Sequence, residues 1–137
     1  MIVLDNSTAT IKAAVDAEAI MIIWKGFAKG DAYRNILKTA LETAQQHQLK
    51  NWISDLTEAK VVSPEDTTWV EETFIPEGLQ AGIKKAIFVI PKDIFSKAYV
   101  EQITLKLKKE KASHSKYKDH EIQFFSSLEE ALGSLQA

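Results

Sequence analysis

The stretch that decides the fold is Lys85-Ala-Ile-Phe-Val-Ile90, an apolar run that ends at Pro91. A short run with no polar interruption is typical of a strand covered on both faces in a parallel sheet. Parallel neighbours need long crossover connections, which are usually helices. The run therefore predicts the central strand of an α/β domain, with strands and helices alternating on either side of it.

The segments before this run fit the alternation. Residues 9–15 and 18–24 are rich in β-branched residues and predict a hairpin that turns at Asp16-Ala17. Between residues 33 and 44 apolar side chains recur at helical spacing, which predicts an amphipathic helix ending near His47. Residues 51–56 then predict a short strand.

A second helix has the clearest start in the chain, Ser63-Pro64-Glu65-Asp66. Serine is a good N-cap, proline suits the first helical position, and acids in the first turn suit the helix dipole. Trp69, Val70 and Phe74 should face the core. Pro76 should kink or restart the helix, because proline lacks an N–H group and disfavours helical geometry at the residue before it.

The segments after the central strand continue the pattern. Asp93 can cap a helix that runs to about Lys109, residues 121–125 predict a last strand, and Ser127-Leu-Glu-Glu130 forms a capping box that opens a short C-terminal helix. The predicted order is ββαβαβαβα in a single domain, residues 1–137. We expect a mixed, mainly parallel sheet of about five strands with helices packed on it.

Composition excludes several kinds of chemistry. The 137 residues include no cysteine, which removes thiol nucleophiles and thiolate zinc sites, and the three histidines have no metal-ligand spacing. The five glycines form no phosphate-binding loop, so we predict neither a metal nor a cofactor, and an enzyme is the least supported class. A net charge of −2 gives no support for nucleic-acid binding. Without a signal-peptide pattern or a long apolar run, we expect a cytoplasmic protein.

Four motifs spread along the chain resemble a known family. They are Trp24-Lys25-Gly26, Asn51-Trp52 followed by Asp55, Ser63-Pro64-Glu65-Asp66 with Trp69, and Phe125 followed by Glu129-Glu130-Ala131. They look like the bacterial single-domain proteins of the STAS superfamily, in the branch that contains sporulation anti-anti-sigma-like (SpoIIAA-like) and SEC14-like proteins. The resemblance implies a small regulatory or binding module with a STAS-like mixed sheet.

The chain departs from the phosphorylatable members of that superfamily at one loop. Those proteins carry an Asp-Ser-Ser-Gly-Leu-like signature, and here Pro64 and Glu65 stand where its serines would be, with Ser63 about one position early. Ser63 could bind or receive phosphate at the start of the helix, or it could be a plain N-cap. We favour the N-cap, because Glu65 and Asp66 would repel a second anion.

Polar residues should gather where the parallel strands end, since ligands of open α/β sheets bind there. Lys25, Asp55 and Lys92 belong to this group. Asp55, expected near Lys25, could act as a general base or hold a ligand. The alternative, which we favour, is that Asp55 accepts loop N–H groups and stabilises the turn.

Charge is divided unevenly between two segments. Residues 105–118 carry six lysines against one glutamate, whereas residues 55–77 carry seven acids against one lysine. Either segment could be merely solvated, or the two could dock head to tail in a homodimer. Our main hypothesis is an interaction module that binds a protein partner through Glu65, Asp66, Glu71 and Glu72. The alternative is a SEC14-like carrier of a lipid or small apolar ligand, with the basic segment near a membrane.

Overall fold

The computed structural model describes residues 1–26, 29–58, 63–90, 101–102, 105, 108–109 and 121–135, and of Thr67, Glu71 and Ile122 it describes the backbone alone. The described residues form one six-stranded sheet whose strands lie in chain order. They are β1 (Ile2–Asp5), β2 (Ala9–Ala14), β3 (Ala19–Trp24), β4 (Asn51–Asp55), β5 (Lys85–Val89) and β6 (Glu121–Phe125). The first three are antiparallel neighbours, and β3 to β6 are parallel.

This sheet confirms the α/β class and its mixed, partly parallel character, but not the predicted count of about five strands. The additional strand is β1, which precedes the predicted hairpin and pairs with β2 through a register irregularity between Ile2 and Leu4. Its short apolar run is half-exposed at the edge of the sheet, so the sequence carries no burial pattern that marks it as a strand.

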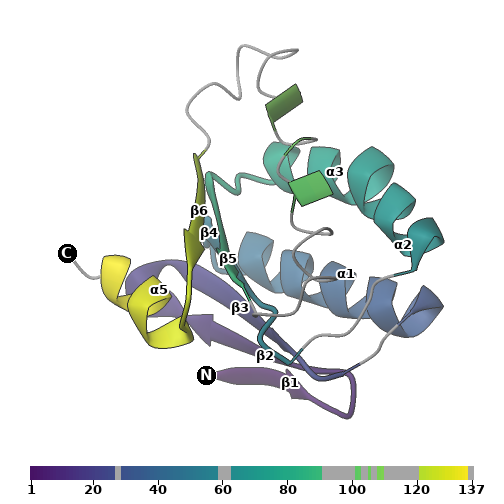
Figure 1. Ribbon diagram of the computed structural model, residues 1–137. Helices are drawn as coiled ribbons and strands as arrows, with labels where there is room; N and C mark the ends of the chain where they lie inside the picture. Colours follow the sequence, from purple (N-terminus) through teal and green to yellow (C-terminus); the bar gives the residue numbers. More distant parts are fainter. Residues whose placement is uncertain are drawn as a thin grey trace.

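Helices cover the two faces of the sheet unequally (Figure 1). Helix α1 (Gly30–Gln46) lies on one face together with a continuous helical segment made of α2 (Pro64–Trp69), the π-turn η2 (Val70–Phe74) and α3 (Ile75–Gln80). Helix α5 (Leu128–Ser134) lies on the other. Residues 101–102, 105 and 108–109 are helical as well, whereas the rest of the predicted helix from Asp93 lies outside the described residues. We call the two sides the α1 face and the α5 face.

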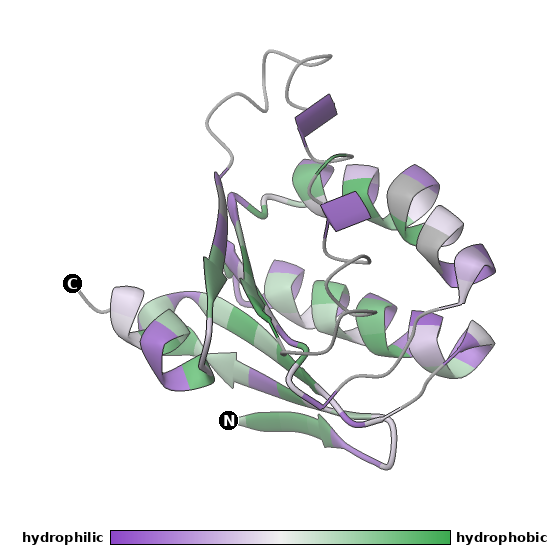
Figure 2. Cartoon of the chain, in the orientation of Figure 1, coloured by the Kyte–Doolittle hydropathy of each residue, from purple (hydrophilic) through white to green (hydrophobic). Residues whose placement is uncertain are grey.

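Each face has its own apolar cluster, because successive side chains of a strand point to opposite sides. The α1 face buries Ile22, Trp24 and Trp52, and the α5 face buries Ile53 and Val89. Figure 2 shows strands that are largely green and helices that alternate green and purple, as amphipathic helices do. β5 is covered on both sides, as predicted, with Ile87 and Val89 fully buried. The prediction that it is the central strand is wrong, because β5 is the fifth of six strands and β3 and β4 lie at the centre of the sheet.

The predicted kink at Pro76 takes the form of a π-turn that ends just before it. An α-helical turn would drive the proline ring into the carbonyl group of Glu72, and the wider turn of η2 avoids this collision without ending the helix. The same turn places Trp69 and Phe74, five residues apart, on one side, where their rings stack at 5.7 Å. Phe74 is buried and Trp69 half-buried, in line with the predicted core contact.

Within the ranges given above, no helix is long and apolar enough to cross a lipid bilayer.

Candidate functional site

The carboxyl ends of β3 to β6 form one edge of the sheet, which we call the carboxyl edge. The strands end there at Trp24, Asp55, Val89 and Phe125. The register places Asp55 laterally between Ile23 of β3 and Val89 of β5. Neighbouring strands are about 4.8 Å apart, so these side chains are adjacent on the α5 face. Two of the predicted residues, Lys25 and Asp55, therefore come to this edge, but they do not meet.

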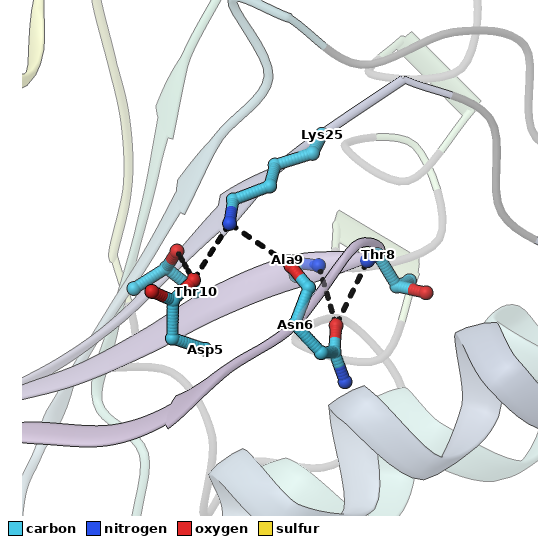
Figure 3. Close-up of polar contacts among 6 residues, drawn as sticks. All are labelled: Asp5, Asn6, Thr8, Ala9, Thr10 and Lys25. Atoms are coloured by element: carbon cyan, nitrogen blue, oxygen red, sulfur yellow. Dashed lines mark hydrogen bonds and ion pairs between the residues drawn. The ribbon is translucent and has the colours of Figure 1, made fainter.

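The Lys25 side chain is hydrogen-bonded to the turn between β1 and β2 (Figure 3). Its Nζ atom donates to Asp5 Oδ1 at 2.6 Å and to the Asn6 carbonyl at 2.9 Å. The hydrogen bond from Lys25, together with one from Thr10, lowers the pKa of Asp5 below its ordinary value. The expectation that Lys25 and Asp55 come together is wrong, because the ammonium group pairs with Asp5 at the end of β1. β2 separates β1 from β3, and the sequence did not reveal β1 as a strand.

The turn that receives Lys25 is itself ordered by a side chain. Asn6 Oδ1 accepts hydrogen bonds from the backbone N–H groups of Thr8 and Ala9, an Asx-type arrangement (Figure 3). The backbone N–H of Lys25 donates to the Thr8 carbonyl. These contacts connect the β1–β2 turn to the end of β3 and give Lys25 a structural role.

Asp55 stabilises the turn that follows β4, as the favoured alternative predicts. Its Oδ1 atom accepts from the Thr57 N–H at 3.1 Å and from the Thr57 hydroxyl at 2.7 Å. The residue is only 7% exposed. Oδ1 is thus bound to the loop, while Oδ2 makes no hydrogen bond with the described residues.

Ser63 is an N-cap, which confirms the favoured interpretation of this serine. Its Oγ accepts from the Asp66 N–H at 3.2 Å and donates to Asp66 Oδ2 at 2.7 Å. The Ser-x-x-Asp spacing is a variant of the capping box. It is the sequence pattern from which the contact between the two side chains could have been predicted.

The prediction that Asp66 belongs to the acidic interaction surface is wrong. Its side chain points inward, and the residue is 1% exposed. Oδ2 accepts from the Gly30 N–H at 2.8 Å, and Oδ1 accepts from Arg34 Nε at 3.0 Å. Burial would raise the pKa of Asp66, but the hydrogen bonds from Gly30, Ser63 and Arg34 and the charge of Arg34 outweigh it and hold the pKa below its ordinary value. The carboxylate thereby joins the starts of α1 and α2.

Arg34, the single arginine, also contacts the ring of Trp69 in α2. Its guanidinium lies 5.2 Å from the centroid of the Trp69 ring, and Lys38 Nζ lies 5.8 Å from the same centroid. Both distances are within the range of cation–π attraction. The contact between α1 and α2 thus combines one ion pair with an aromatic ring that two cations of α1 approach.

The outer side of the second helical segment is polar and acidic. Glu65, Glu72 and Glu77 are exposed, with Thr68 and Thr73 among them. We call these five residues the acidic stripe. Of the other predicted interaction residues, the Glu71 side chain and the whole of Lys92 lie outside the described residues, so the predictions for them stay open.

The described residues contain no group of three or more histidine or acidic side chains that could hold a metal ion. No protein-family model matches the chain, and no curated protein matches it. Function is therefore inferred from the geometry of the carboxyl edge and from the acidic stripe.

Proposed function

We propose that the chain is a non-catalytic, cytoplasmic interaction module of the STAS type, and that it binds a protein partner through the acidic stripe on the helical segment from Pro64 to Gln80. The observation that supports this most is that the acids of that segment differ in exposure. Asp66 is buried and hydrogen-bonded, whereas Glu65 and Glu72 extend into solvent on a helix whose other side is packed in the core.

Two polar residues of the predicted site are bound within the chain, which favours binding over catalysis. Lys25 is paired with Asp5, and Ser63 serves as a helix cap. Catalysis by general acids and bases needs a group positioned to exchange a proton with substrate. Lys25 contacts the β1–β2 turn and Ser63 caps α2 instead.

The stripe favours a partner with a basic surface. Glu65, Glu72 and Glu77 recur every five to seven residues along a segment that also presents threonine hydroxyls, so the surface offers carboxylates and hydrogen-bonding groups together. Arg34 and Lys38, which flank Trp69 on α1, limit the acidic area on one side. Such charge patterns set binding orientation and association rate, and they make binding sensitive to salt.

A photo-crosslinking amino acid at the exposed position Thr68 tests the proposal in cells, with Gln46 on α1 as the matched control position. We expect a protein that crosslinks from position 68 and not from position 46. The crosslinked protein is then purified, and its affinity for the chain is measured at low and high salt.

Reversing two charges of the stripe, Glu65→Lys with Glu72→Lys, should lower the affinity for the crosslinked protein by roughly tenfold or more at low salt. The control reverses Glu42 and Glu129, which are exposed on α1 and α5, and should change the affinity less than about twofold. Equal affinity of both double variants, or equal crosslinking from both positions, would refute the proposal.

A further inference from the structure

Asp55 is largely buried, and the described residues use only one of its two carboxylate oxygens. Oδ1 is held by Thr57, and within the described part of the chain Oδ2 makes no hydrogen bond. The residue is 7% exposed, and no fully buried side-chain nitrogen or oxygen among the described residues lacks a partner. Oδ2 therefore lies at the small part of Asp55 that still reaches solvent.

The surroundings of Asp55 are apolar. Its lateral neighbours on the α5 face are Ile23, which is half-buried, and Val89, which is fully buried. Ile53, two residues earlier on the same strand face, is fully buried too. A carboxylate among such side chains is poorly solvated, and a charge in this position attracts an opposite charge more strongly than an exposed one does.

Two cations of the described residues, Lys25 and Arg34, are paired with other acids. Lys25, two residues beyond Ile23 on the adjacent strand, gives its ammonium group to Asp5, and Arg34 lies on the α1 face with Asp66. Among the described residues, no lysine or arginine nitrogen comes within 4.0 Å of Asp55. As far as the described residues go, the charge of Asp55 is available to a group from outside the chain.

We infer that Asp55 Oδ2 is a binding site for a primary ammonium group, with Ile23 contacting the alkyl carbons of the ligand. An ammonium group donates up to three hydrogen bonds, and its positive charge complements the negative charge of the carboxylate. The site is on the α5 face and is independent of the acidic stripe on the other side of the sheet. The same chemistry is present in a small free amine and in the lysine side chain of a protein.

Nuclear magnetic resonance titration of the ¹⁵N-labelled chain with n-butylammonium chloride tests this inference. We expect saturable shifts of the backbone amides of Ile23, Thr57 and Val89. The neutral isostere n-butanol, added to the same sample, should produce much weaker shifts, because it lacks the charge that pairs with Asp55. Equal shifts with both compounds, or no saturable shift with the amine, would overturn the inference.

Asp55→Asn keeps an oxygen for Thr57 and removes the charge, so it should weaken n-butylammonium binding at least about tenfold. Asp31→Asn removes one exposed carboxylate from α1 and should leave binding unchanged. Unchanged binding in Asp55→Asn would contradict the site. If that variant does not fold, the comparison of amine and alcohol on the natural chain decides the question.

A second titration with Nα-acetyl-lysine amide separates the two sources of the ammonium group. Tighter binding of the lysine derivative than of n-butylammonium assigns the site to a protein side chain, and the reverse order assigns it to a free amine. Both results support the site. Failure of both compounds refutes it, and this failure would leave the acidic stripe and its crosslinking experiment unaffected.

Discussion

Replacing Asp66 with asparagine should destabilise the fold, because three donors converge on the two oxygens of this carboxylate. Gly30 N–H and Ser63 O–H point to Oδ2, and Arg34 Nε–H points to Oδ1. Asparagine has one oxygen. Whichever way its amide is turned, its NH₂ group faces either the Gly30 N–H or the Arg34 Nε–H, so a donor meets a donor.

The expected loss of unfolding free energy is about 2–3 kcal/mol at pH 7. This is below the usual cost of breaking a fully buried ion pair, because the Arg34 side chain is 32% exposed and can be hydrated when its partner changes. For a domain of this size the loss corresponds to a fall in melting temperature of about 7–10 °C.

Urea unfolding followed by tryptophan fluorescence measures the loss. The control, Asp31→Asn, removes an exposed acid from the first turn of α1, as Asp66→Asn removes a buried one from the first turn of α2. The pKa of Asp66 is lowered in the fold, so its stabilising effect is complete above the ordinary value of 3.8 and disappears as the pH falls through the folded-state pKa. The gap between natural chain and variant should therefore narrow below pH 4. A gap under about 0.5 kcal/mol at pH 7, or one that does not narrow as the pH falls below 3.8, would refute this reasoning.

Three further predictions follow from single contacts. Ser54→Ala removes the acceptor of the buried Trp52 Nε1–H and should cost about 1–3 kcal/mol in urea unfolding, whereas an unchanged midpoint would mean that water replaces the hydroxyl. Ser63→Ala should cost about 1 kcal/mol through the lost cap, and mass spectrometry after incubation with cognate kinases should find Ser63 without phosphate. Asp5→Asn breaks the exposed pair with Lys25 and should leave the melting temperature unchanged within error; a clear fall would show that the pair orders the β1–β2 turn.

The elements with a strong local pattern could be predicted from the sequence. The apolar run at residues 85–90 matches β5, and the helical spacing between residues 33 and 44 matches α1. β1 could not be predicted, because a half-exposed edge strand is defined by its pairing with β2 rather than by its own pattern. The form of the break at Pro76 was also inaccessible, since a π-turn arises from the local fit of the proline into a helix that the core holds in place.

In the candidate site, too, local contacts could be predicted from the sequence and long-range contacts could not. The Ser63 cap and the Asp55 turn depend on residues two or three positions away, and both were predicted. The burial of Asp66 depends on Gly30 and Arg34, more than thirty residues earlier in the chain, and this contact appears only when α1 and α2 are packed together. An acid in the first turn of a helix is equally compatible with a solvated surface and with such a contact.

Three aspartates near the carboxyl edge differ in the cation that each receives, and this difference determines where a ligand can bind. Asp5 has Lys25, and Asp66 has Arg34, so an added cation would have to displace a side chain held at high local concentration. Asp55 receives two hydrogen bonds from Thr57 and no cation within the described residues. An external ammonium group therefore meets no competing ion pair from the described residues at Asp55.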